Sequence, residues 1–225
     1  MHSNMFTVLS VLTLLGTIGV VGLALVATVW GLTHGNRLLT RRGLQAAAGM
    51  TAVYIAVLAV VSLVSREQVL PPGSEKYFCE LDCHLAYSVE HVEPLRTSPQ
   101  GGQTTWAVRL RTRFDENTIS PTRGREAPLS PNPRRLALID SSGRQYPPAE
   151  GLEPVLSQLG VTSTPLTREL RPGESYTTTL VFVLPEGAVP TRLALQEDIF
   201  VDRLIIGHER SLFHKPVLFG LPGAG

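Results

Sequence analysis

Two long stretches without any charged residue occupy the first third of this chain and constrain its fold more than any other feature. They cover residues 5–32 and 44–64, and neither contains Asp, Glu, Lys or Arg. A helix needs about 20 predominantly apolar residues to cross the hydrocarbon core of a bilayer. Both stretches reach that length, so we expect two transmembrane helices that form a hairpin within residues 1–66.

The charges beside these stretches predict their orientation. Arg37, Arg41 and Arg42 lie between them, whereas residues 1–4 contain no Lys or Arg and Arg66 is followed by Glu67. Cytoplasmic loops are enriched in Lys and Arg, so we expect this loop in the cytoplasm and both termini outside it. A cleaved signal peptide is the alternative for the first stretch. Signal peptides, however, have a basic start and a shorter apolar region, and this stretch has neither.

Small residues recur on both expected helices, and such residues let helix backbones approach closely in lipid. The favoured interpretation is that these faces pack the two helices of the hairpin against each other. Docking on a larger membrane complex, or self-association, is the alternative. The residues are Gly16, Gly19 and Gly22 in the first stretch and Ala48, Ala52 and Ala56 in the second.

After the hairpin, the chain is long enough for one ordinary domain. We expect a linker at residues 67–76, which includes Pro71 and Pro72, a β-domain at residues 77–219 and a flexible tail at residues 220–225. The formal net charge is +1, which argues against nucleic acid as a partner. Arginine far outnumbers lysine, a bias typical of GC-rich bacteria. For a bacterial membrane protein with this topology, we expect the hairpin in the inner membrane and the C-terminal domain in the periplasm or on the outer surface.

Alternating residues predict that the β-domain is an all-β sandwich. Between Trp106 and Phe114, the residues Arg109, Arg111 and Arg113 share one face of a strand and apolar residues share the other. Turn-forming residues at 140–143, 171–174 and 185–187 separate further segments of this kind. We expect the other strands at residues 85–89, 135–139, 166–170, 176–184, 192–196 and 203–206, with one short helix at residues 152–159.

Several of these segments resemble a known family. Residues 136–140 followed by 143–146, and residues 170–175 leading into 180–185, resemble the telokin-like, immunoglobulin-like bacterial domains of unknown function. Such domains occur in secreted and membrane-anchored proteins. The resemblance covers about the second half of the β-domain. It implies an immunoglobulin-like sandwich and no catalytic residue.

Cys79, Cys83 and His84 form a local cluster that could carry chemistry. Disulfides persist outside the cytoplasm, so the structural interpretation is a Cys79–Cys83 bridge that ties the linker to the first strand. The bridge requires a turn between the two residues, because cysteines four apart in an extended strand lie too far apart to bond.

The same cluster allows a c-type haem site, in which His follows the second of two thioether cysteines. The usual spacing leaves two residues between the cysteines, and here there are three. A second axial ligand would have to come from His91, His208 or His214, because no methionine follows Met50.

Two thiolates and a histidine also suit copper or another soft metal. Paired cysteines with this spacing resemble those of Sco-type copper chaperones and of the copper centre in oxidase subunit two, which also places two membrane helices before a β-sandwich. In that subunit the copper ligands lie late in the sandwich, whereas Cys79 and Cys83 lie at its start. We therefore expect a disulfide and no metal or cofactor, with haem or copper at Cys79, Cys83 and His84 as the alternative.

Arg109, Arg111 and Arg113 could bind an anionic partner such as lipid head groups or an acidic protein surface. The structural interpretation is that arginines on the outer face of a strand keep the sheet soluble. Common catalytic motifs are absent from the sequence, so we do not expect an enzyme. The expected function is a non-catalytic binding or assembly module with a membrane or periplasmic protein partner. The alternative is a redox or metal-handling accessory of a respiratory membrane complex.

Overall fold

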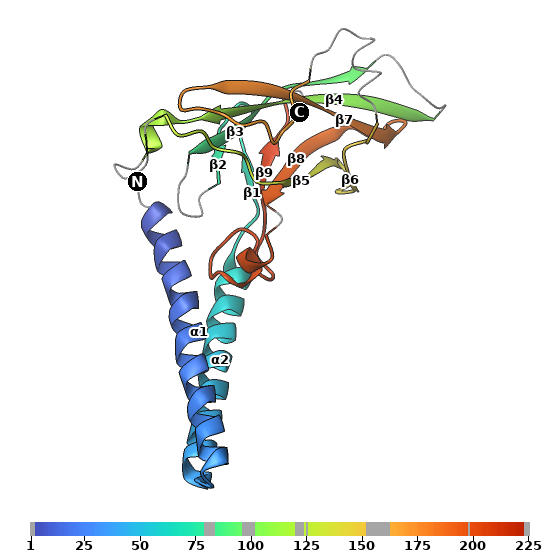
Figure 1. The fold of residues 1–225 in the computed structure, drawn as a ribbon. Helices are drawn as coiled ribbons and strands as arrows, with labels where there is room; N and C mark the ends of the chain where they lie inside the picture. Colours follow the sequence, from blue (N-terminus) through green and yellow to red (C-terminus); the bar gives the residue numbers. More distant parts are fainter. Residues whose placement is uncertain are drawn as a thin grey trace. The chain divides into compact units, whose positions relative to one another are not determined.

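The chain divides into a helical unit and a β-unit (Figure 1). The helical unit comprises Met1–Arg66 and Ile199–Lys215, and the β-unit comprises Glu67–Asp198 and Pro216–Gly225. The helix expected at residues 152–159 lies outside the residues that the structure describes. This computed structural model describes residues 3–78, 84–95, 102–119, 124, 126–151, 163–197 and 199–222.

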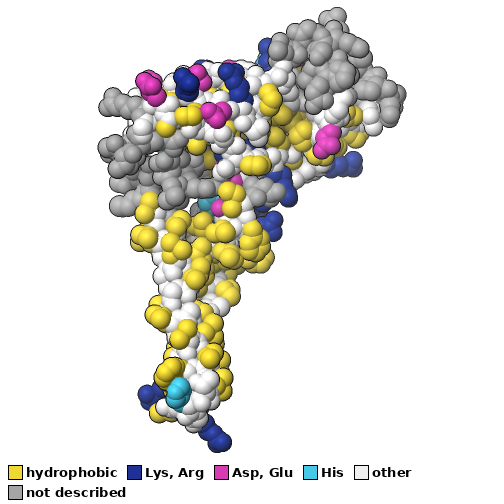
Figure 2. Space-filling model, viewed as in Figure 1, with side chains coloured by type: hydrophobic (Ala, Val, Ile, Leu, Met, Phe, Trp, Pro, Cys, Tyr) yellow, Lys and Arg dark blue, Asp and Glu magenta, His cyan; other side chains and the backbone are white. Residues whose placement is uncertain are grey.

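The two apolar N-terminal helices are confirmed as α1 (Ser3–Thr33) and α2 (Arg37–Val64). The mean hydropathy reaches 2.4 in Val8–Thr33 and 2.3 in α2, so each helix is long and apolar enough to be a candidate membrane span. Figure 2 shows apolar side chains along the hairpin and basic ones at its tip.

The connection between the helices is shorter than the loop that the sequence predicts between residues 32 and 44. Because the Asn36 side chain accepts a hydrogen bond from Leu39 N at 3.0 Å, α2 begins at Arg37 rather than at residue 44. Gly35 adopts φ 67°, which allows the tight turn before this cap. The three arginines therefore belong to the first turns of α2.

α1 and α2 pack through buried residues on one face of each helix. In α1 the buried and half-buried residues from Ser10 to Gly31 recur at an alternating spacing of four and three, the repeat of left-handed helix pairs. The backbones approach closely at two glycines. A Cβ atom at Gly31 would lie 2.8 Å from Thr40 N, and one at Gly43 would lie 2.8 Å from Ala24 O. The buried residues are Ser10, Leu14, Thr28 and Gly31 in α1 and Gly43, Ala47, Leu58 and Ser62 in α2.

The small-residue faces that the sequence favoured as the hairpin contact are exposed, so that prediction was wrong. Gly16, Gly19 and Gly22 have no neighbour within 4 Å of a Cβ position. Ala48, Ala52 and Ala56 are also exposed. Successive residues of a helix point about 100° apart. A row of residues that starts one position away from the buried row, as Ala48 does relative to Ala47, therefore lies off the contact face.

The β-unit contains two sheets, as the sequence predicts. Neighbouring strands are antiparallel except for β1 and β9, which are parallel. One sheet has the order β1 (Gln68–Leu70), β9 (Val217–Gly220), β8 (Pro190–Glu197), β5 (Arg134–Asp140), β6 (Gln145–Tyr146). The other has the order β2 (Lys76–Tyr77), β3 (Leu85–Leu95), β4 (Gln103–Phe114), β7 (Ser175–Pro185).

One hydrophobic core joins the two sheets. The alternation predicted for β4 is confirmed, because Val108, Leu110 and Phe114 are fully buried while the arginines between them lie on the outer face. The largest buried side chains come from both sheets and include Tyr87, Phe182, Leu138, Leu195 and Phe219.

Two expected strands do not form. In residues 166–170, only Leu170 pairs, through an isolated bridge to Leu129. Residues 203–206 lie in a 3₁₀ helix, η2 (Val201–Leu204), and the turn after it. A second 3₁₀ helix, η1 (Glu116–Thr118), follows β4. The structure also has strands that the sequence did not predict, namely β1 within the expected linker, β2 at its C-terminal end, and β9.

The turn between β5 and β6 is stabilised by the Asp140 carboxylate. This group accepts hydrogen bonds from Ser142 Oγ at 2.7 Å, from the backbone N–H groups of Ser142 and Arg144, and from the Tyr146 hydroxyl. The Ser142 hydroxyl and the other donors lower the pKa of Asp140 from 3.8 to about 2. Gly143 adopts φ 85°, as the predicted hairpin turn requires.

Acid should destabilise this turn. Because the pKa of Asp140 is lower in the folded chain, its contribution to stability is present above pH 4 and is lost between about pH 4 and pH 2. We expect the Asp140→Asn variant to be less stable at pH 7 and to lose less stability across that window. Denaturant unfolding at a series of pH values measures both effects. An equal loss across the window in both proteins would contradict the prediction.

Candidate functional site

The cysteine cluster lies in the connection between β2 and β3. Cys79 and Cys83 are outside the described residues, so the predicted disulfide remains a prediction. Tyr77 pairs with Ala86 in antiparallel register, so the chain reverses direction between them.

The surroundings of His84 are those of a residue that stabilises the fold. Its side chain is fully buried, its ring stacks on Phe114 at 5.3 Å between centroids, and its Nδ1 lies 2.7 Å from Thr118 Oγ1. His91 lies on β3 and carries a half-exposed side chain beside Glu93. Seven residues of extended chain separate His84 from His91, about 23 Å, so the two cannot share one haem iron.

The three arginines of β4 are paired with carboxylates. Arg109 lies 2.9 Å from Glu93 and Arg111 lies 4.0 Å from Glu90. Arg113 makes two hydrogen bonds to Glu75, at 2.8 and 2.7 Å, and this interaction holds the pKa of Glu75 below its usual value. The stripe is therefore a ladder of ion pairs rather than an open cationic surface. Pairs of this kind contribute about 0.2–1 kcal/mol each.

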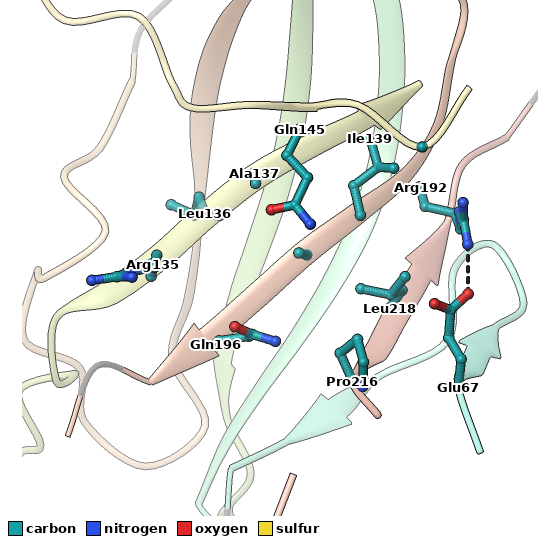
Figure 3. Close-up of a pocket in the computed structure, with 12 residues that line it drawn as sticks. Glu67, Arg135, Leu136, Ala137, Ile139, Gln145, Arg192, Gln196, Pro216 and Leu218 are labelled. Carbon is teal, nitrogen blue, oxygen red and sulfur yellow. Dashed lines mark hydrogen bonds and ion pairs between the residues drawn. The ribbon is translucent and has the colours of Figure 1, made fainter. Parts of the chain in front are cut away.

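A groove of about 300 Å³ lies on the outer face of the five-stranded sheet (Figure 3). Its floor is a row across three strands, because Ala137 of β5 pairs with Ala194 of β8, which pairs with Leu218 of β9. The two alanines face each other where neighbouring positions carry long side chains. The hollow therefore follows from the register of small residues.

Polar side chains form the rim of this groove. Arg135 and Gln196 pair on one side of the floor, and Gln145 of β6 extends beside Ala137 (Figure 3). On the other side Arg192 binds Glu67 at 2.5 Å. The groove thus combines an apolar floor, two amide side chains and two cations, of which Arg192 is balanced by Glu67.

A buried ionic cluster links the two sheets inside the β-unit. Arg134 and Glu197 form an ion pair whose side chains are only 2% and 3% exposed. The Arg134 guanidinium lies 4.2 Å from the centre of the Phe78 ring, and Lys76 Nζ lies 4.6 Å from it. Lys76 Nζ also donates hydrogen bonds to the backbone oxygens of Leu195 and Val217, at 2.9 and 3.1 Å. The cluster joins β2 of one sheet to β8 and β9 of the other.

Sequence reasoning missed the groove and the buried cluster. Alanines and glutamines at alternate positions of a strand do not form a recognisable motif. Whether they lie side by side depends on the register of β5, β8 and β9. Lys76 was assigned to a linker. It is one of only two lysines in the chain and is followed by two aromatic residues, which is a weak signal for a buried role. Arg134 and Glu197 are far apart in sequence, so only the fold reveals their pairing.

Comparisons with known proteins identify no family. No family profile matches the chain, and no curated protein matches it. Among solved structures, the chain is similar to a conserved hypothetical protein from Bacillus anthracis with 15% sequence identity and a TM-score of 0.40. The similarity covers 58% of this chain and 90% of that one. It is too distant to assign a function, and the telokin-like resemblance is not confirmed.

Proposed function

We propose that this chain is a membrane-anchored binding or assembly module. In this proposal the helical hairpin spans a bacterial inner membrane and holds an immunoglobulin-like sandwich on its extracytoplasmic side. The candidate spans support the anchor, and Arg37, Arg41 and Arg42 at the hairpin tip support a cytoplasmic loop.

The order of the strands supports the immunoglobulin-like assignment. In that fold, strands A, B and E are neighbours in one sheet, and strands G, F, C and C′ are neighbours in the other. Here β3, β4 and β7 follow one another in one sheet, and β9, β8, β5 and β6 in the other. The tryptophan and the inter-sheet cysteines of antibody domains are missing, because β5 contains no Trp and β4 and β8 contain no Cys.

The groove above Ala137, Ala194 and Leu218 is the observation that carries the binding role. Its floor suits small apolar side chains, and Gln145 and Gln196 carry amides that can both donate and accept hydrogen bonds. An uncharged segment of a partner protein therefore matches the groove. Arg192 is a poor site for a phosphate group, because Glu67 already balances its charge.

Photocrosslinking of the full chain in its membrane tests this role. A photoreactive phenylalanine at Gln145 should give an adduct of defined mass, and Ala194→Phe, which fills the groove, should abolish it. The same reagent at Arg109, on the outer face of the other sheet, is the matched control. An adduct of twice the chain mass would identify a second copy as the partner. Adducts from Arg109 alone, or adducts that Ala194→Phe leaves unchanged, would refute the groove as the binding face.

The redox or metal-handling role of Cys79, Cys83 and His84 remains the alternative. His84 is bound to Thr118 and packed on Phe114, an environment that suits a structural residue. The intact mass of the purified chain separates the two functions. A mass two hydrogens lower, restored by a reductant, indicates the disulfide and the binding module, whereas a retained haem or metal would favour the alternative.

A further inference from the structure

The segment Ile199–Lys215 belongs to the helical unit although it lies late in the sequence. It leaves the β-unit after β8 and returns to it at β9. Two hydrogen bonds attach it to α2 and to the C-cap residue of that helix. The Tyr54 hydroxyl donates to Leu204 O at 2.7 Å, and Lys215 N donates to Ser65 Oγ at 2.8 Å. We call residues 199–215 the return segment.

The bond to Tyr54 fixes how far the return segment reaches along α2. The bilayer core is about 30 Å thick, which corresponds to about 20 residues of helix. If the core begins at Leu44, just after the arginines, it ends near Val64. A tyrosine side chain spans about 6.5 Å, which is roughly four residues of helical rise. Adding the 2.7 Å hydrogen bond places Leu204 O no farther out than about residue 60. The return segment therefore extends past the C-terminal end of α2 toward the centre of the bilayer.

The return segment buries Ile205 and Ile206 but exposes several other large apolar side chains and buries two polar ones. Phe200 and Phe213 are 70% and 68% exposed, whereas Asp202 and Ser211 are 3% and 4% exposed. Val201, Leu204 and Leu212 add further exposed apolar surface. Large exposed apolar patches mark membrane or protein contacts. This patch continues the apolar surface of the hairpin, and Figure 2 shows apolar side chains concentrated at the end of the hairpin away from the basic tip.

Phe213 adopts φ 67°, a left-handed conformation that is rare for a bulky residue. The Phe213 side chain is nevertheless exposed, so packing within the protein does not offset the strain. Contact of the exposed ring with lipid would offset it.

Six backbone N–H groups of the return segment donate to carbonyls of the same segment. Its N–H groups donate to carbonyls three residues earlier at Arg203, Ile205, His208, Ser211 and His214, with distances of 2.9–3.3 Å. Leu212 N donates to Arg203 O at 3.1 Å, and the Ser211 hydroxyl donates to Ile205 O. Irregular backbone at membrane depth requires such internal partners, because hydrocarbon offers none.

We propose that the return segment inserts into the lipid of the extracytoplasmic leaflet, with Phe200 and Phe213 as its anchors. This inference rests on the proposed membrane anchor. The geometry places the insertion within about 5–10 Å of the boundary of the core, the depth of interfacial elements. The β-unit is then attached to the membrane through three chain connections, after Arg66, before Ile199 and after Lys215.

Depth-dependent quenching of tryptophan in the full chain, reconstituted in vesicles that contain brominated lipids, tests the insertion. In a Trp30→Phe/Trp106→Phe background, Phe213→Trp or, separately, Phe200→Trp provides the probe. Tryptophan at position 186, in the exposed turn after β7, is the matched control. We expect the probes at 213 and 200 to be quenched by bromolipids at least about twofold more than the control and to be protected from iodide in water.

Native Trp30 in α1, in a Trp106→Phe background, reports separately on the anchor. If bromolipids quench Trp30 while the probes at 213 and 200 respond only to iodide, the insertion is wrong and the anchor stands. If Trp30 also escapes bromolipid quenching, the proposed anchor fails. Circular dichroism of each variant shows whether the β-unit remains folded.

Discussion

Glu197→Gln is expected to lower the free energy of unfolding of the β-unit by about 3–5 kcal/mol, the cost of removing one partner from a buried ion pair. The substitution preserves the shape of the side chain and removes its charge. The Arg134 guanidinium would then remain inside the protein without its carboxylate, next to the Phe78 and Tyr87 rings at 4.2 and 5.3 Å. Denaturant unfolding of the full chain in detergent, followed by circular dichroism, measures the change.

Two further variants show whether burial causes this effect. Glu75→Gln removes the carboxylate of a partly exposed pair with Arg113 and should cost less than about 1 kcal/mol. Arg134→Met combined with Glu197→Leu removes both buried charges and should recover most of the stability, because apolar side chains of similar volume replace a buried ion pair well. If Glu197→Gln unfolds at the wild-type denaturant concentration, the pair does not stabilise the β-unit.

Local patterns in the sequence were sufficient to predict both helices and several of the strands. The apolar stretches predicted both helices, since hydropathy alone determines such segments. The alternation around Arg109, Arg111 and Arg113 predicted β4 and its buried face, because side chains alternate along a strand whatever lies beside it. The turn at Gly143 was predicted for a similarly local reason.

Features that depend on pairing between distant segments could not be predicted. β9 is only Val217–Gly220, too short to show alternation, and it forms because β8 and β1 lie on either side of it. Residues 203–206 have apolar residues typical of a strand but lie in η2 and a turn of the helical unit, where Tyr54 binds Leu204. The groove above Ala137 and Ala194 depends on register in the same way.

Gly43→Leu should separate α1 from α2. A Cβ atom at this position would lie 2.8 Å from Ala24 O and 3.1 Å from Thr28 N, both of them backbone atoms of α1 that a rotamer change cannot move. Overpacking of this kind costs about 1–3 kcal/mol. Titration of the detergent-solubilised chain with SDS, followed by Trp30 fluorescence in a Trp106→Phe background, should show loss of the hairpin at a lower SDS fraction.

Gly49→Leu is the matched control for this substitution. Gly49 lies in the same helix and has no neighbour within 4 Å of a Cβ position, so the two variants gain the same leucine and the same hydropathy. Any difference between them measures the contact with α1. Helices in lipid associate through close packing rather than through exclusion of water, so the loss should appear only in Gly43→Leu. Identical SDS midpoints for the two variants would show that α1 and α2 do not meet at Gly43.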